Sequence, residues 1–211
     1  AMDPPKHDEQ RKVVAPVVGS AKLAKIESVI RERAGAILDG LPINVEFDWV
    51  DRVSIELTTQ ILAMLFDFPW EDRRMLARWS NVAMAIPESG IVSSEAAREG
   101  EIMECYYYFK TLWDKRAKLP PQNDFVSAMA HSEAMRDMPM NEFIGNIILL
   151  IVGGNDTTRN SISGGVLALN ENPSEYDKLR QNHELVGNMV SEIVRWQTIT
   201  SEFAAACRST I

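Results

Sequence analysis

The strongest constraint on the fold is a long apolar segment that runs into two adjacent glycines. Six consecutive aliphatic residues precede Gly153 and Gly154. A block that is apolar on all sides is typical of a helix buried inside a larger protein. It is shorter than the roughly 20 apolar residues that a membrane-spanning helix needs. Pro139 suits a first helical turn and Pro173 stops the far end, so we expect one buried helix over residues 140–172.

The two glycines need an explanation, because each costs a helix roughly 1 kcal/mol relative to alanine. One explanation is a groove in which a ligand approaches the backbone closely. Asp156 and Thr157 follow the glycines and would supply an acid and a hydroxyl, the parts of a proton relay. The other explanation is a helix break, with Asp156 or Thr157 capping a second helix. The segment alone leaves both open.

Two shorter motifs lie on other predicted helices. Glu192 and Arg195 are three residues apart and therefore share a helix face. His7 and Arg11 lie one helical turn apart near the start. Each motif is weak alone, since most such charged pairs are solvated and contribute little to stability.

Their order and spacing carry more information than any one motif. H-x-x-x-R, then G-G-x-D-T-T in a long core helix, then E-x-x-R resembles the cytochrome P450 family, the heme-thiolate monooxygenases. Residues 150–161 and 2–8 look most like the soluble bacterial subfamily that hydroxylates terminal carbons of medium-chain alkanes. The resemblance runs from residue 1 to about residue 198 and covers roughly half of the family's chain.

The resemblance implies a mainly α fold, the central part of the cytochrome P450 fold. This part extends from the first heme-facing helix through the E-x-x-R helix. We expect it to lack the amino-terminal sheet region and the carboxyl-terminal cysteine loop of the family.

The resemblance also implies roles for the motif residues. Thr157 would donate a hydrogen bond to the distal oxygen and Asp156 would gate protons from solvent. The predicted heme-binding residues are His7, Arg11, Gly153 and Gly154, the first two toward the heme propionates. Glu192 and Arg195 would form a structural ion pair buried behind the heme pocket.

The resemblance also implies a lid over the substrate channel. The helices expected at residues 71–85 and 94–118, together with the loop between them, would form this lid. Four apolar residues there would face the substrate: Met84, Ile86, Ile91 and Val92. Ordinary packing under a loop is the alternative for these residues.

The iron ligand of the family, a cysteine in a glycine-rich loop, is absent from this chain. Cys105 lies among aromatic residues and is expected to pack in the core, and Cys207 has no Phe or Gly at the required offsets. No other metal-ligand spacing occurs in the sequence. We therefore expect the chain by itself to be inactive.

The cofactor implied by the resemblance is heme, iron protoporphyrin IX. The implied partners are ferredoxin and ferredoxin reductase, which pass electrons from NAD(P)H, and a small apolar substrate. A competing interpretation is a helical ligand-binding or interaction domain without catalysis, in which G-G-x-D-T-T is only a helix junction.

Composition narrows the possible partners and the location. The net charge of −8 argues against nucleic acid as a ligand, which requires a basic face. Two cysteines provide no disulfide framework and fit a reducing cytoplasm. No segment predicts a membrane span.

Residues 199–211 resemble no part of the family. Their sequence is the one that common cloning-site codons would encode, so we expect a vector-derived tail after a partial domain at residues 1–198.

Overall fold

The computed structural model describes residues 3–85 and 89–196, and these residues contain helices and loops without any β-strand. The helices are α1 (Lys6–Val14), α2 (Ser20–Asp39), α3 (Glu56–Phe66), α4 (Arg74–Met84), α5 (Glu95–Arg116), α6 (Phe125–His131), α7 (Met140–Glu171), α8 (Pro173–Gln181) and α9 (Val186–Trp196). Shorter helical segments are η1 (Ala15–Val18), the π-helix η2 (Val50–Ile55) and η4 (His183–Leu185). The predicted mainly α fold is confirmed.

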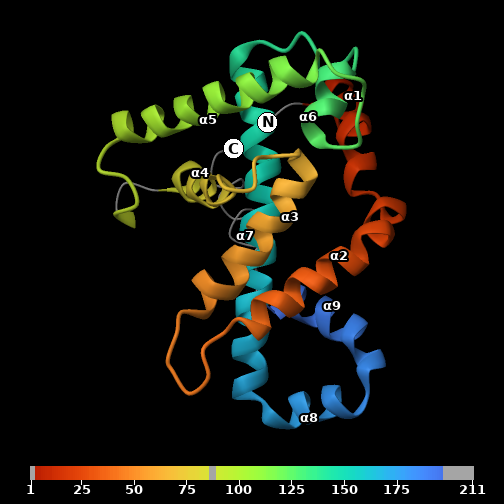
Figure 1. Cartoon of the computed structure of the whole chain (residues 1–211), viewed down its shortest axis with the longest axis vertical. Coiled ribbons are helices and arrows are strands. Elements are labelled where there is room, and N and C mark those ends of the chain that lie inside the picture. Colours follow the sequence, from red (N-terminus) through yellow and green to blue (C-terminus); the bar gives the residue numbers. More distant parts are fainter. Residues whose placement is uncertain (1–2, 86–88, 197–211) are drawn as a thin grey trace.

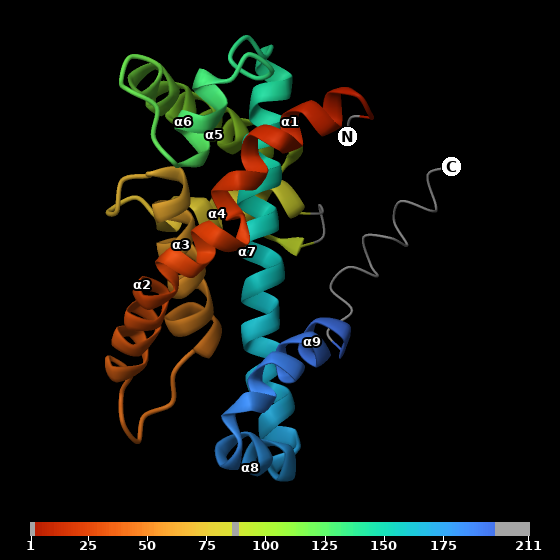
Figure 2. The ribbon, with the colours of Figure 1, turned by 90° about the vertical axis from the view of Figure 1, so that its right-hand side faces the viewer.

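Helix α7 is the axis of the molecule (Figure 1). It runs without a break through Gly153 and Gly154, so the prediction of one continuous helix is confirmed and a helix junction at the glycines is wrong. Figure 2 shows α1 crossing the first half of α7, while α8 and α9 lie at its carboxyl-terminal end. No helix within the described ranges is both long and apolar enough to cross a bilayer.

The core lies between α3, α4, α5, α6 and the first half of α7. Phe66 and Phe109 are fully buried with ring centroids 5.2 Å apart, and Trp79 lies 6.0 Å from Phe109. Burial of each such side chain stabilises the fold by roughly 1.5–3 kcal/mol. Cys105 has no exposed surface and belongs to this core, as the sequence predicted.

Local capping sets several helix starts. Ser94 accepts a hydrogen bond from the Ala97 amide at 3.1 Å and begins α5. Asp124 accepts one from the Ser127 amide at 2.8 Å and begins α6. Both side chains satisfy amides that would otherwise lack partners at a helix start.

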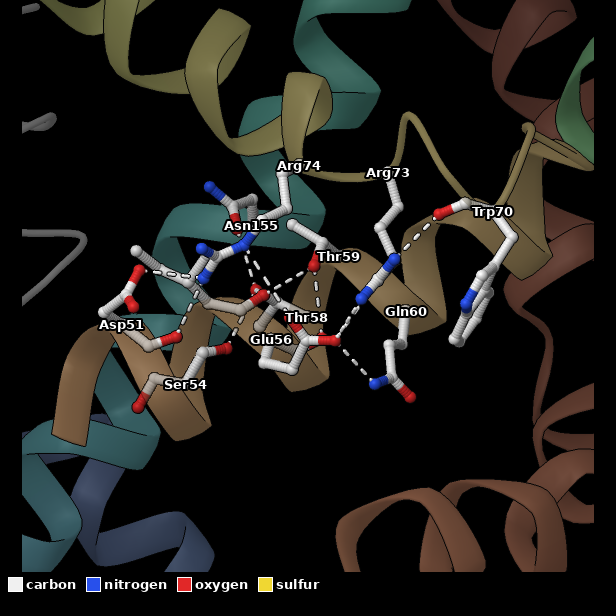
Figure 3. A network of polar contacts seen from close by, with 11 residues as sticks. Asp51, Ser54, Glu56, Thr58, Thr59, Gln60, Trp70, Arg73, Arg74 and Asn155 are labelled. Atoms are coloured by element: carbon white, nitrogen blue, oxygen red, sulfur yellow. Dashed lines mark hydrogen bonds and ion pairs between the residues drawn. The ribbon is translucent and has the colours of Figure 1, made fainter. Parts of the chain in front are cut away.

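A polar network fixes α4 against α3 (Figure 3). Glu56 accepts hydrogen bonds from Arg73 Nη2 at 2.7 Å and from Gln60 Nε2 at 2.8 Å. Burial acts to raise the pKa of Glu56, but the hydrogen bonds from Gln60 and Arg73 outweigh it and leave that pKa below its ordinary value. The ionised carboxylate therefore joins the two helices that flank α7.

Candidate active site on α7

The two glycines of α7 face different surroundings. A Cβ built on Gly153 meets nothing within 4 Å, whereas one built on Gly154 would lie 2.6 Å from Leu62 Cδ2 of α3. Gly154 therefore permits close packing of two helices, and its predicted contact with a cofactor stays a prediction. Gly153 lies on an open face that also carries Leu149, which is 69% exposed.

The Thr157 side chain is held by its own helix. Its Oγ1 donates a hydrogen bond to the Gly153 carbonyl oxygen at 2.8 Å, and its carbonyl oxygen accepts one from Ser161 Oγ at 2.8 Å. This conformation leaves the acceptor lone pairs of the Thr157 hydroxyl available. The hydroxyl thus lies at the open Gly153 face, where the sequence predicted a catalytic group.

The Asp156 side chain points to α4 and is largely buried. Its Oδ1 accepts hydrogen bonds from Ser80 Oγ at 3.0 Å and from Asn155 Nδ2 at 3.1 Å, and lies 3.0 Å from Arg159 Nη2. Arg159 also donates to Asn81 of α4 at 2.9 Å. The acid that follows the glycines is therefore clamped between two helices.

Asn155 extends this network into the core. Its side chain is fully buried, and its Oδ1 accepts a hydrogen bond from Thr58 Oγ1 of α3 at 2.8 Å (Figure 3). Sequence reasoning did not select Asn155, Thr58, Ser80 or Arg159. A polar amide inside an apolar helix, and an arginine three residues after Asp156, were the available signals.

Helix α1 meets α7 through Lys6 and Gln10, which both hydrogen bond to Glu142. The hydrogen bond from Lys6 holds the pKa of Glu142 below its ordinary value. His7 and Arg11 are offset from these contacts along α1 and share another face of it. Arg11 is exposed and has no ionic or hydrogen-bonding partner in the part of the chain that the structure describes. A free cation at this place can bind a carboxylate.

No family model matches the chain. Linalool 8-monooxygenase of Pseudomonas putida is 33% identical over 196 residues, which are 92% of this chain and 48% of that protein. Steroid C26-monooxygenase of Mycolicibacterium smegmatis is 30% identical over 203 residues, 96% of this chain and 46% of that protein.

Two solved structures are more similar still. Cytochrome P450-153 from Novosphingobium aromaticivorans is 45% identical with a TM-score of 0.81, over 93% of this chain and 47% of that one. CYP153D17 from Sphingomonas sp. PAMC 26605 is 46% identical with a TM-score of 0.84, over 92% of this chain and 49% of that one. The chain belongs to the cytochrome P450 family. It spans about half the length of the cytochrome P450 relatives it matches.

The predicted E-x-x-R ion pair is formed, and the described residues leave it exposed, so its predicted burial behind the heme pocket stays a prediction. Arg195 Nε donates to Glu192 Oε2 at 2.8 Å, and this hydrogen bond lowers the pKa of Glu192. The side chains of Glu192 and Arg195 are 57% and 67% exposed. Glu192 also borders the cavity that lies between α7, α8 and α9.

Of the predicted lid residues, Met84 ends α4, while Ile91 and Val92 lie in the loop that precedes α5. Met84 and Ile91 are 41% and 37% exposed, and Val92 is half-buried. Ile86 lies outside the described residues, as do residues 199–211. A substrate contact for these residues stays a prediction.

The described residues of this cytochrome P450 contain no group of three or more His, Cys, Asp or Glu that could hold a metal ion. Cys105 is unsuited to ligation, because burial foremost and the neighbouring Glu104 raise the pKa of its thiol far above the ordinary value. A flat organic cofactor does fit the open α7 face, where Gly153 presents no side chain and Leu149 presents an apolar one.

Proposed function

We propose that this chain is part of a heme-thiolate monooxygenase that inserts one oxygen atom from O2 into an unactivated C–H bond. The observation that carries the proposal is the open space beside Gly153, which we call the notch. The Thr157 hydroxyl lies at this notch and donates a hydrogen bond to the Gly153 carbonyl oxygen, within one continuous helix. Such a notch places a proton-bearing group beside a space that no described side chain fills. The acid next in sequence, Asp156, adds the second part of a proton relay.

Heme is the cofactor that fits this surface best. Leu149 and Gly153 of α7 would contact its face, and His7 and Arg11 of α1 would bind its propionates. Arg11 is suited to that role because it has no ionic partner within the described ranges. When bound through a thiolate ligand, heme supplies the activation of O2.

The side chains of this segment would handle protons and water. Thr157 would hold a proton at Oγ1. Rotation about χ1 of Thr157 would break the hydrogen bond from this hydroxyl to the Gly153 carbonyl oxygen and make the proton available. Asp156 would take a proton from solvent and pass it inward through water. The exposed Leu149 would keep water away from the apolar substrate.

We infer that the substrate is an alkane or a similar aliphatic chain, hydroxylated at a terminal carbon. Two relatives are named as monooxygenases of linalool and of a steroid, which are mostly hydrocarbon. Electrons would come from NAD(P)H through ferredoxin reductase and ferredoxin. Met84, Ile91 and Val92 are apolar, which suits contact with such a substrate.

The competing function is a helical binding domain without catalysis. A cavity of about 430 Å³ between α7, α8 and α9, lined by Leu169, Met189 and Ile193 among others, favours it. That volume is within the range of small-molecule sites, about 300–1,000 Å³. The two functions differ in whether oxygen chemistry occurs at all.

The test uses the full-length protein with heme, ferredoxin and ferredoxin reductase. We expect the reduced protein to give the red-shifted absorption band of a thiolate-bound heme with carbon monoxide, and to convert octane to 1-octanol with consumption of NADH. Ligand binding without that band and without alcohol would refute the monooxygenase and favour the binding domain.

A further inference from the structure

The carboxylate of Asp156 is held by one oxygen only. Its Oδ1 receives Ser80 Oγ, Asn155 Nδ2 and Arg159 Nη2, all at 3.0–3.1 Å. Its Oδ2 has no partner in residues 3–85 and 89–196. Two hydrogen bonds and one ion pair on the same oxygen fix the direction of the carboxylate and leave the other oxygen free to exchange a proton.

Asn155 is the donor that ties this carboxylate to the core. The Asn155 side chain has no exposed surface, and its Oδ1 accepts from Thr58 Oγ1 at 2.8 Å. An ionised carboxylate can only accept hydrogen bonds, so the amide must turn Nδ2 toward Asp156 and Oδ1 toward Thr58. Figure 3 shows the Asn155 side chain directed to Thr58 on α3.

The other two donors are anchored elsewhere. Ser80 belongs to α4, and Arg159 is shared with Asn81 of the same helix. Movement of α4 would therefore shift two donors of Asp156 together. Asn155 does not depend on α4, because its second bond goes to α3.

Packing alone does not account for an asparagine at this position. Removing an amide from water is unfavourable, and an apolar side chain of similar size avoids that cost. The cost is offset only because both polar atoms of Asn155 find partners. The pattern of these partners is therefore the informative feature, since each one contributes to the orientation of Asp156.

We propose that Asn155 is a positioning residue that fixes Oδ1 of Asp156 and so makes Oδ2 the oxygen that takes protons from solvent. The role rests on the monooxygenase function proposed above. Asn155 itself is buried, and its side chain bonds to Thr58 and Asp156. It acts through Asp156, and Thr58 acts through Asn155.

The test compares three variants with the wild-type full-length, heme-loaded protein. Asn155→Asp keeps the shape and the acceptor for Thr58 but replaces the N–H group with a second carboxylate oxygen beside Asp156. Thr58→Val removes the anchor together with the bonds of that hydroxyl to the Ser54 and Ile55 carbonyl oxygens. Asn170→Leu is the matched control on the same helix, because Asn170 is exposed and donates only to the Val166 carbonyl oxygen.

We expect Asn155→Asp to lower alcohol formed per NADH about tenfold or more, the effect of one hydrogen bond to a charged group. Hydrogen peroxide should rise in proportion. KM for substrate should stay within about twofold, because Asn155 does not contact the open face. Thr58→Val should give a smaller loss in the same direction, and Asn170→Leu should give none.

A second readout does not depend on activity. With ¹³C-carboxyl-labelled aspartate, the Asp156 carboxyl resonance, assigned by its loss in Asp156→Asn, should move in Thr58→Val and stay in place in Asn170→Leu. If the wild type makes no alcohol, the proposed function fails, while this resonance still tests the positioning of Asp156. An active wild type in which Asn155→Asp and Thr58→Val both behave like Asn170→Leu in coupling and in resonance would overturn the role of Asn155.

Discussion

The two adjacent glycines of α7 should respond differently to alanine, although they occupy neighbouring positions in one helix. The Cβ of an alanine at position 154 would lie 2.6 Å from Leu62 Cδ2, and Leu62 is only 2% exposed. That distance is too short for two carbon atoms, so α3 or the Leu62 side chain must move. The Cβ of an alanine at position 153 would point into open space.

The magnitudes follow from two opposing effects. Alanine gains about 1 kcal/mol over glycine within a helix, and nothing opposes this gain at position 153. At position 154 the same gain is opposed by overpacking, which costs about 1–3 kcal/mol in a well-packed region. The net change in the free energy of unfolding for Gly154→Ala should therefore be about 0 to −2 kcal/mol. The free energies of unfolding of the two variants should therefore differ by about 1–3 kcal/mol.

Urea unfolding followed by far-ultraviolet circular dichroism, without added cofactor, measures both variants. The decisive addition is Leu62→Val, which removes the Cδ atoms that clash. In that background Gly154→Ala should become neutral or stabilising. Equal stability of Gly153→Ala and Gly154→Ala, or no relief from Leu62→Val, would refute the packing explanation.

Four further predictions follow from the same geometry. Thr157→Ala in the full-length protein should lower alcohol formed per NADH about tenfold or more and raise hydrogen peroxide, since a general acid contributes at least that much; unchanged coupling contradicts it. Arg195→Ala in the full-length protein should give little heme-loaded protein, because the predicted role requires that the rest of the protein bury the pair, and the variant would then leave Glu192 uncompensated. The ratio of heme to protein absorbance measures this, and normal heme content would count against the ion-pair role. Because the folded pKa of Glu56 is depressed, its stabilisation is present above the ordinary pKa of about 4.3 and is lost as pH falls through the folded value. Urea titrations should therefore show the stability advantage of wild type over Glu56→Gln shrinking in acid, and a constant advantage argues otherwise. Burial raises the pKa of the Cys105 thiol, so in a Cys207→Ser background iodoacetamide should label it only on unfolding, as mass spectrometry would show.

Local signals made much of the fold predictable. Ser94 begins a helix where the sequence placed one, because a cap depends only on the next few residues. The apolar run before Gly153 and the proline at position 173 were enough to define α7. The π-helical form of η2 was not predictable, since its apolar pattern fits an α-helix equally well.

The site was predictable only in part, because its contacts join distant segments. The motif drew attention to Asp156, but no local rule shows that Ser80 of α4 meets it. Thr58 and Asn155 are 97 positions apart, and neither reveals the other in a single sequence. The expected burial of Glu192 and Arg195 is not seen among the described residues for a related reason, since burial depends on what packs over a helix.

Helical geometry explains why five adjacent residues of α7, 153–157, have different roles. Successive residues turn by about 100°, so Thr157 lies only about 40° around the axis from Gly153, on the same open face. Gly154 and Asn155 fall at about 100° and 200°, and both contact α3.

Asp156 falls at about 300° and reaches α4. The acid and the hydroxyl are thus neighbours in sequence but point about 100° apart. A proton that passes from Asp156 to Thr157 must therefore cross through water. It follows that the direction of the free Asp156 oxygen, more than its distance along the chain, decides whether such a path exists.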